Sequence, residues 1–167
     1  TFTAQKEESL FSYAYYHDRT QYPLLMHKHD FYEINIITGG EGRHYIEDSY
    51  TMATKGDVFV LPPGIFHGYF EGHDLDIFHL VLSDVFMNKY YNILNSFTGF
   101  HTMFEIEPLL RKTIKEDFFL SLSEEQFSYI KPELDILVKL EDIKYSGMGH
   151  IKSLKSISLI GMLSLMF

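Results

Sequence analysis

The stretch HKHDFYE, residues 27–33, decides how the first half of the chain is interpreted. It contains two histidines two positions apart and a glutamate four positions after the second. In a β-strand, residues i, i+2 and i+6 point to the same face, so His27, His29 and Glu33 converge, and Asn35 shares their face. Imidazole nitrogens and carboxylate oxygens suit first-row transition metals. This strand is therefore the candidate site.

A second segment, GDVFVLPPGIFH at residues 56–67, contributes His67. Its Pro-Pro-Gly sequence predicts a tight turn that aims His67 back over the sheet. On spacing alone, two interpretations stay open for the imidazoles of His27 and His29, the Glu33 carboxylate and His67. They form a metal site, or they form a buried polar cluster that binds a small ligand. The chain has nine histidines, which raises the number of accidental pairs.

The composition restricts the class of protein. A length of 167 residues suits one domain, with or without a small helical appendage. The absence of Cys excludes disulfides and thiolate metal sites and fits a cytoplasmic protein. The formal net charge of −9 argues against direct binding of nucleic-acid phosphates. The stretch TFTAQKEESL lacks the order of a signal peptide, and SISLIGMLSLMF is too short to span a bilayer, so we expect no membrane contact.

Residues 1–82 have the pattern of short strands and turns. The expected strands are rich in β-branched and aromatic residues: YPLLM, FYEINIIT, RHYIE, DVFVLP and DIFHLVL. Turn signals separate them at close and even spacing: GGEG, EDS, TKGD, PPG and EGHD. This spacing predicts a β-sandwich or a β-barrel.

From Ser83 onward the periodicity is helical. A first helix begins at a Ser83 N-cap and puts four apolar residues on one face: Phe86, Tyr90, Ile93 and Phe97. A long loop follows, then DFFLSLS as a further strand or an extended crossing. The capping box SEEQ, at residues 123–126, starts a second helix with another apolar face: Phe127, Ile130, Leu134 and Leu137. Pro132 predicts a kink in this helix or a later start.

The last helix, from about Gly149, is apolar on most of its circumference. Its apolar residues are Ile151, Leu154, Ile157, Leu159, Met162, Leu163 and Met166. We expect it to form a homodimer contact, and the alternative is docking on its own barrel or on the preceding helix. The helix has no stop signal before Phe167, so we expect the chain to be part of a longer protein.

Two segments of the chain resemble the cupin family. Residues 27–40, HKHDFYEINIITGG, resemble the first cupin motif, and residues 56–67 resemble the second. Gln21 and Glu71 replace the glycine and asparagine that the motifs usually carry, but neither position is a metal ligand. The resemblance implies a mainly β fold with C-terminal helices, in which a double-stranded β-helix (jelly-roll) barrel precedes two or three α-helices. It also implies a metal-ligand set: His27, His29, Glu33 and His67.

The layout of a barrel followed by helices resembles the N-terminal effector domain of AraC-type bacterial transcription regulators. The resemblance implies an effector-binding barrel at residues 1–82 and a helical and extended part of the same domain at residues 83–167, whose last helices dimerise. It implies a small-molecule effector, often a carbohydrate, and a DNA-binding helix-turn-helix domain beyond residue 167. It allows a divalent transition metal, Zn, Ni, Mn or Fe, as cofactor. No enzymatic activity is expected.

The expected ligand-binding set is therefore His27, His29, Glu33, Asn35, Tyr45 and His67. If no ion binds, the same side chains can hydrogen-bond sugar hydroxyls. Of His44 and Tyr45, one faces inward, and Tyr45 is the commoner sugar-stacking type. Arg43 is expected at a solvated rim, and His79 in DIFHLVL is expected to be an ordinary core histidine.

Two other functions compete with the regulator. The four ligands would permit a metal-dependent cupin enzyme that acts on a small sugar or organic acid. The sequence offers no separate nucleophile–base pair to support it. A storage or scaffold protein with a vestigial site is the third interpretation.

Overall fold

The computed structural model describes residues 12–17, 24–114 and 119–167. Its first half contains six strands: β1 Ser12–His17, β2 Leu24–His27, β3 Tyr32–Ile46, β4 Ser49–Thr54, β5 Asp57–Leu61 and β6 His67–Leu82. The second half is mostly helical: α1 Asp84–Leu94, the π-helix η2 Thr102–Ile106, α2 Glu107–Ile114, the short strand β7 Leu120–Ser121, α3 Glu124–Leu140 and α4 Met148–Met166. The predicted order, a β-rich body followed by helices, is confirmed.

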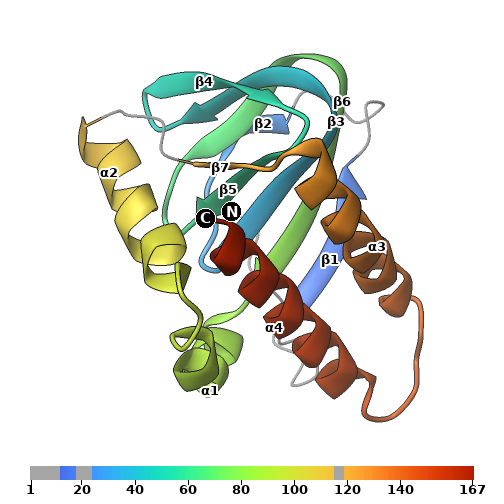
Figure 1. Cartoon of the computed structure of the whole chain (residues 1–167). Helices are drawn as coiled ribbons and strands as arrows, with labels where there is room; N and C mark the ends of the chain where they lie inside the picture. Colours follow the sequence, from blue (N-terminus) through green and yellow to red (C-terminus); the bar gives the residue numbers. More distant parts are fainter. Residues whose placement is uncertain (1–11, 18–23, 115–118) are drawn as a thin grey trace.

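The described strands form one antiparallel sheet in the order β1-β6-β3-β5-β7, with β2 also paired to β6 and β4 to β3. The long strands β3 and β6 bend where their register shifts, between Ile37 and Arg43. Figure 1 shows the sheet curling over on itself beyond this bend. One face of the sheet therefore becomes an inner face, and the other is free to meet the helices.

The prediction that GGEG and EGHD are turns is wrong, because both lie within strands. Gly40 has a φ of 65°, and a Cβ there would come within 2.2 Å of the Asp74 carbonyl oxygen. The glycines therefore allow bulges and a close backbone approach without reversing the chain. The sequence reading also missed β1 and β4 as strands.

The start of α1 is as predicted, because the Ser83 hydroxyl accepts a hydrogen bond from the Phe86 amide at 3.1 Å. Ile93, expected on the buried face, is 48 % exposed. The long loop expected after α1 contains η2 and α2 instead. Within α2, Nη2 of Arg111 forms a buried ion pair with Oε2 of Glu107, one turn earlier, at 2.8 Å.

Helix α3 confirms the capping box, since Ser123 and Gln126 bond each other's backbone. Its four predicted apolar residues, Phe127, Ile130, Leu134 and Leu137, are buried. Pro132 neither starts nor ends the helix, which continues to Leu140. The predicted strand in DFFLSLS is confirmed only as β7, and its first two residues lie outside the described part.

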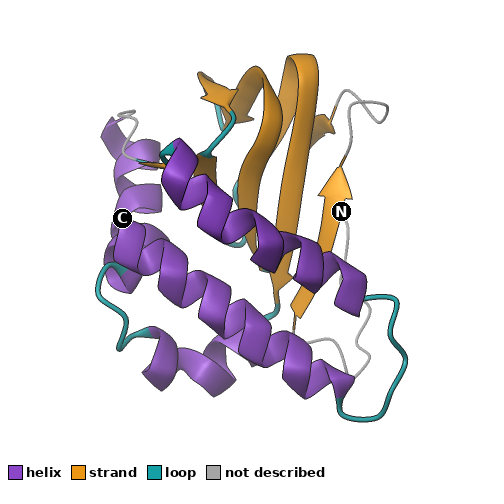
Figure 2. Ribbon diagram, turned by 45° about the vertical axis from the view of Figure 1, so that its right-hand side comes forward, coloured by secondary structure: helices purple, strands orange, loops and turns teal. Residues whose placement is uncertain are grey.

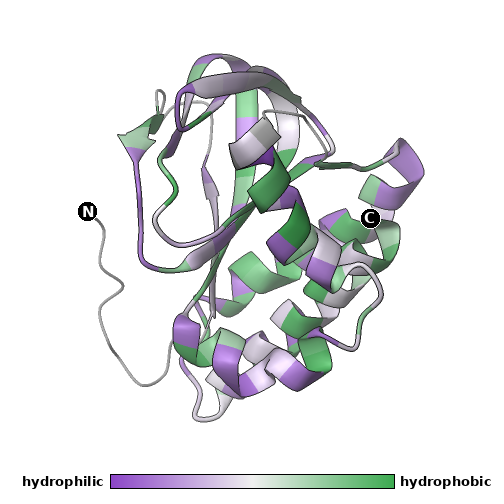
Figure 3. Ribbon diagram, turned by 90° about the vertical axis from the view of Figure 1, so that its left-hand side faces the viewer, coloured by the Kyte–Doolittle hydropathy of each residue, from purple (hydrophilic) through white to green (hydrophobic). Residues whose placement is uncertain are grey.

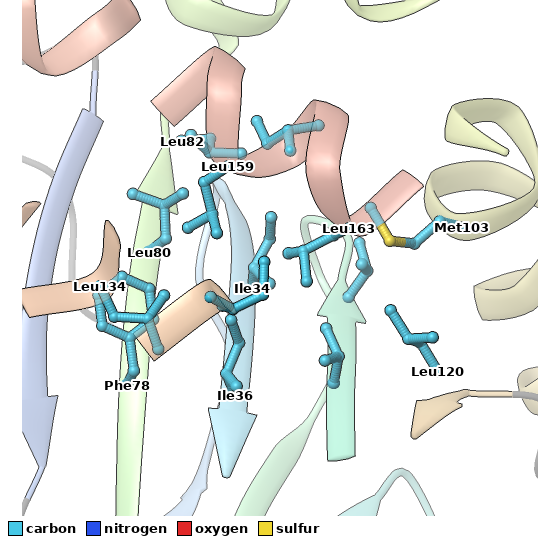
Figure 4. Packing of buried hydrophobic residues seen from close by; sticks show 14 of the residues in the cluster. Ile34, Ile36, Phe78, Leu80, Leu82, Met103, Leu120, Leu134, Leu159 and Leu163 are labelled. Carbon is cyan, nitrogen blue, oxygen red and sulfur yellow. The ribbon is translucent and has the colours of Figure 1, made fainter. Parts of the chain in front are cut away.

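The main hydrophobic core lies between the outer face of the sheet and the helices (Figure 4). There Ile34 and Ile36 of β3 meet Leu134 of α3 and Leu163 of α4. Figure 2 shows α3 and α4 lying across this face. Figure 3 shows that the helices contain both hydrophilic and hydrophobic residues, as expected for helices that are buried on one side. Figure 4 shows further members of the same core: Phe78, Leu80, Leu82, Met103, Leu120 and Leu159.

Helix α4 docks on its own sheet, with Ile157 and Leu163 buried, while Ile151 and Leu154 stay exposed. A role of this helix in dimerisation stays a prediction. Among the described residues, no helix is long and apolar enough to cross a membrane.

Candidate functional site

Glu33 is the centre of a buried polar cluster on the inner face of the sheet. Its side chain is 3 % exposed. Oε1 accepts a hydrogen bond from Nδ1 of His79 at 2.6 Å, and Oε2 accepts one from Nε2 of His29 at 3.0 Å. Nε2 of His67 lies 3.3 Å from the same Oε2. The convergence of His29, Glu33 and His67 that the sequence predicted is therefore present in the structure.

The cluster keeps Glu33 ionised although it is buried. Burial alone would raise its pKa, because a charged carboxylate loses hydration. The charge of His79 and the hydrogen bonds from His29 and His79 outweigh burial, so the pKa of Glu33 lies well below its usual range. The carboxylate is thus available as a ligand for a cation.

Three of the four predicted metal ligands point to a common position. One ligand atom each of His27, Glu33 and His67 lies within 4.8 Å of the others. Nδ1 of His27 is bonded to the Leu25 carbonyl and Nδ1 of His67 to the Ile65 carbonyl, which leaves Nε2 of each ring as the ligand atom.

The buried Nε2 of His67 supports this arrangement. Although it lies 3.3 Å from Oε2 of Glu33, it has no hydrogen-bond partner among the residues that the structure describes. With the Nδ1 proton donated to a carbonyl, a neutral ring would aim a lone pair at the carboxylate, which is unfavourable unless a cation lies between them. The donor set of two imidazoles and one carboxylate therefore fits a divalent transition metal.

His29 has a different position from the one expected. Its Nδ1 bonds the Phe31 carbonyl at 2.8 Å, and its Nε2 bonds Glu33. Because a carbonyl and a carboxylate only accept, both ring nitrogens donate and neither offers a lone pair. In this arrangement His29 orients Glu33 and balances its charge. It does not point at the position shared by His27, Glu33 and His67.

The turn after β5 brings these segments together. Gly64, in the Pro-Pro-Gly sequence, has a φ of 83°, which an L side chain rarely adopts. Its amide donates a hydrogen bond of 2.9 Å to the carbonyl of His29. The chain then enters β6, where His67 pairs with His27 of β2. The predicted role of this turn in aiming His67 is consistent with these contacts.

His79 and Tyr15 belong to the cluster and were not predicted. Tyr15 pairs with His79 across β1 and β6, and the two rings stack with centroids 4.6 Å apart. The Tyr15 hydroxyl is within hydrogen-bonding range of Glu33, and burial, followed by the charge of Glu33, raises the pKa of Tyr15. His79 is a buried histidine, as expected, but it directly holds the Glu33 carboxylate.

A second group of polar side chains on the inner face has atoms without hydrogen-bond partners in residues 12–17, 24–114 and 119–167. The Asn35 amide donates to the Tyr69 hydroxyl at 3.3 Å, and its Oδ1 is unpartnered. His44 is fully buried and stacks on Tyr69, with ring centroids 4.2 Å apart. Neither of its nitrogens has a hydrogen-bond partner within the described part of the chain. Burial, and then the charge of Arg111, lower the pKa of His44 well below its usual range, so this ring is neutral.

Tyr45 is not brought together with these residues. Strict alternation from Glu33 would put odd-numbered residues inside, but the register shifts before Arg43 reverse the parity. His44 therefore faces inward, and Tyr45 packs against Tyr50 and Phe70, with ring centroids 5.2 and 5.3 Å away. The predicted rim position of Arg43 agrees with its exposed ion pair to Glu71, at 3.0 Å.

Comparison with known proteins agrees with this arrangement. The family model described as the AraC-like ligand binding domain matches residues 11–83. This segment is similar to AraC-like ligand-binding domains. It contains β1 through β6 and all the residues of the Glu33 cluster. No curated protein sequence matches the chain.

Solved structures extend the likeness beyond the strands. ToxT K231A of Vibrio cholerae strain SCE256, an AraC-family regulator, is 13 % identical with a TM-score of 0.56, covering 89 % of this chain and 53 % of the ToxT chain. This likeness shows that nearly the whole chain shares its fold with part of ToxT. The chain spans about half the length of ToxT.

Two other solved structures match a smaller share of the chain. KdgF from Halomonas sp. is 23 % identical with a TM-score of 0.34, covering 37 % of this chain and 59 % of its own. A cupin-2 domain protein from Shewanella frigidimarina NCIMB 400 is 18 % identical with a TM-score of 0.35, covering 41 % and 66 %. The expected fold class, mainly β with C-terminal helices, is confirmed by the antiparallel sheet and the helices that follow it.

Proposed function

We propose that the chain is the effector-sensing module of an AraC-type transcription regulator. Residues 1–82 would form the barrel that binds the effector, and residues 83–167 would complete the same domain. One observation supports this most strongly: Glu33 is buried among imidazoles from β2, β6 and the segment after β2, within the part of the chain that matches the ligand-binding family.

A divalent ion is proposed at His27, Glu33 and His67, with Zn, Ni, Mn and Fe as candidates. Such an ion would offer open coordination positions to oxygen atoms of the effector. His29 and His79 would hold the carboxylate in place, because each donates a hydrogen bond to one of its two oxygens.

The effector itself is proposed to be a small polar molecule, with carbohydrates as the first candidates. The unpartnered atoms on the inner face include the Asn35 oxygen, both nitrogens of His44 and Nε2 of His79. Neutral His44 offers one donor and one acceptor, and this combination suits hydroxyl groups, which both donate and accept. A buried polar group without a partner is costly, so a polar ligand would recover stability here.

The module would act as a homodimer, with DNA bound by a separate helix-turn-helix domain. Three exposed apolar side chains of α4, Ile151, Leu154 and Leu165, support a contact between copies. The net charge of −9 supports DNA binding elsewhere in the protein. A cytoplasmic, non-enzymatic protein is part of the same proposal.

A thermal-shift screen of sugars, with and without Zn²⁺, tests this function. A sugar that is the effector should raise the melting temperature of the wild type and lose this effect in Asn35→Ala. Exposed Asn92→Ala, on α1, is the matched control and should keep the response. A response that is equal in wild type and Asn35→Ala would contradict binding on the inner face.

A metal-dependent enzyme is the second candidate. The observation that favours it is the group of two histidines and one carboxylate, the ligand type of non-haem Fe(II) oxygenases. Oxygen consumption by the Fe(II)-loaded protein with a panel of small organic acids and sugars tests it. Turnover that disappears in Glu33→Gln would favour the enzyme over the sensor.

A further inference from the structure

Strand β1 contacts the Glu33 cluster with one face and the helices with the other. Its odd-numbered side chain Tyr15 stacks on His79 and reaches Glu33. Its even-numbered side chain Tyr16 donates a hydrogen bond of 2.7 Å to Asp135 of α3. Alternation along a strand produces these two faces, so adjacent residues connect the polar cluster to a helix.

Two more contacts join β1 to α3 and α4. The Ala14 amide donates to Oε1 of Glu141, the residue that ends α3, at 3.0 Å. The other oxygen of Glu141 is paired with Lys152 of α4 at 2.7 Å, and this pair is largely buried. The hydroxyl groups of Ser12 and Ser156 are 3.0 Å apart. A movement of β1 would therefore change the contacts at the C-terminal end of α3 and along α4.

Strand β1 lies at the edge of the sheet, next to the helices. Among the described strands it pairs only with β6, so it is an edge strand, and its other edge is bonded by the Glu141 side chain. Binding at Glu33 would redistribute the hydrogen bonds that this carboxylate accepts, and Tyr15 joins it to β1 through its interaction with Glu33 and its stacking on His79.

We infer that Tyr15 couples occupancy of the Glu33 site to the packing of α3 and α4, with β1 as the connecting strand. The inference rests on the proposed sensing function and specifies its regulation. A ligand shifts such an equilibrium only if it binds the two arrangements with different affinity, and the Tyr15–Glu33 contact provides that difference. Tyr15 is thus a positioning residue, and it does not ligate the ion.

The exchange rate of the Ala14 amide, measured by NMR, reports directly on the contact between β1 and α3. At saturating Zn²⁺ the wild type should change this rate about tenfold, a typical coupling between sites. Tyr15→Phe keeps the ring and its stacking on His79 but lacks the hydroxyl, so its Ala14 response should be lost. Tyr13→Phe, on the same strand with an exposed side chain, is the matched control and should respond like the wild type.

A second measurement needs no ligand. In metal-free protein, Glu33→Gln should alter Ala14 exchange when Tyr15 is present and have no further effect in Tyr15→Phe, a non-additive double-mutant cycle. Phe59→Leu, on β5 with two strands between it and β1, perturbs the same barrel and should combine additively with Tyr15→Phe. This control separates coupling from general loss of stability.

The outcomes distinguish the inference from the proposed function. Additive effects of Glu33→Gln and Tyr15→Phe would overturn the coupling, as would a Zn²⁺ response of Ala14 that persists in Tyr15→Phe. Absence of Zn²⁺ binding would remove the metal assignment alone, because the double-mutant cycle is measured without metal and still decides the role of Tyr15.

Discussion

The two faces of β3 have opposite chemistry although both are buried. On the outer face, Ile34 and Ile36 join an apolar core with the helices. On the inner face, Glu33 bonds imidazoles and Asn35 bonds the Tyr69 hydroxyl, and several polar atoms there have no partner among the described residues. Apolar burial stabilises a fold, whereas a buried unpartnered polar atom costs free energy. The outer face therefore carries the larger apolar core, and the inner face, which also has a smaller apolar cluster, is where binding is to be sought.

The largest expected effect belongs to the outer face. Leu163→Ala, in the core between α4 and the sheet, should lower the free energy of unfolding by about 2–5 kcal/mol, because it removes buried methyl groups and leaves a void. Leu165→Ala, two residues away and 69 % exposed, should change it little. Chemical denaturation measures both. Equal destabilisation by the two variants would contradict the packing of α4 described above.

The next effect belongs to the inner face. Glu33→Gln should weaken Zn²⁺ binding by about 100-fold or more, since even residues that only support a ligand contribute 10- to 100-fold. Calorimetric titration measures the loss, and circular dichroism checks that the fold is kept. If Glu33→Gln binds Zn²⁺ as tightly as the wild type, the carboxylate is not a ligand.

A smaller loss of affinity is expected for His79, which holds the carboxylate and does not point at the ion. His79→Phe removes the Nδ1–H that donates to Glu33 and should weaken Zn²⁺ binding by about 10- to 100-fold. His73→Phe changes an exposed histidine of the same strand and should bind like the wild type. An unchanged affinity in His79→Phe would limit its role to packing.

The difference between the two faces also explains what could be predicted from the sequence. The spacing of His27, His29 and Glu33 is local, so the sequence predicts that they lie close together. The prediction that one strand carries all three is wrong, because β2 ends at His27 and β3 begins at Tyr32. The participation of His79 depends on pairing between β3 and β6, which are far apart in the chain. The participation of Tyr15 depends on pairing between β1 and β6, which are also far apart in the chain. Local alternation carries no information about such partners.

Bulges and tertiary contacts account for the other differences. The register shifts before Arg43 reversed the inward parity, which is why His44 took the place predicted for Tyr45. Helix α2 was missed because its sequence is short and lacks a long apolar stripe, and its Arg111 is fixed by the distant carbonyl of Val60 at 2.8 Å. The capping box of α3 was predicted correctly because it is defined within four residues.

The capping box provides a further test of the outer layer. Ser123→Ala removes the hydroxyl that accepts from the Gln126 amide and should destabilise the protein by about 1 kcal/mol. Denaturation with urea measures this cost, and Ser128→Ala, an exposed serine inside α3, serves as the comparison. A larger cost for Ser128→Ala would contradict the assigned start of the helix.

The smallest expected effect depends on pH. Hydrogen bonds from Lys131 and Tyr16 outweigh partial burial and lower the pKa of Asp135 below its ordinary value of 3.8. A lowered folded-state pKa stabilises the protein above the ordinary value, and this contribution is lost as the pH falls through the folded-state pKa. Asp135→Asn should therefore be slightly less stable than wild type at pH 6, and the difference should shrink on acidification. A difference that grows toward low pH would contradict this sign.

The most direct test of the central claim is calorimetric titration of metal-free protein with Zn²⁺. The account predicts one ion per chain in the wild type, and loss of this binding in His27→Ala and in His67→Ala. His101→Ala removes an exposed histidine that also faces a glutamate, at 2.9 Å, and should bind one ion like the wild type. One-to-one binding that survives both His27→Ala and His67→Ala would contradict the account.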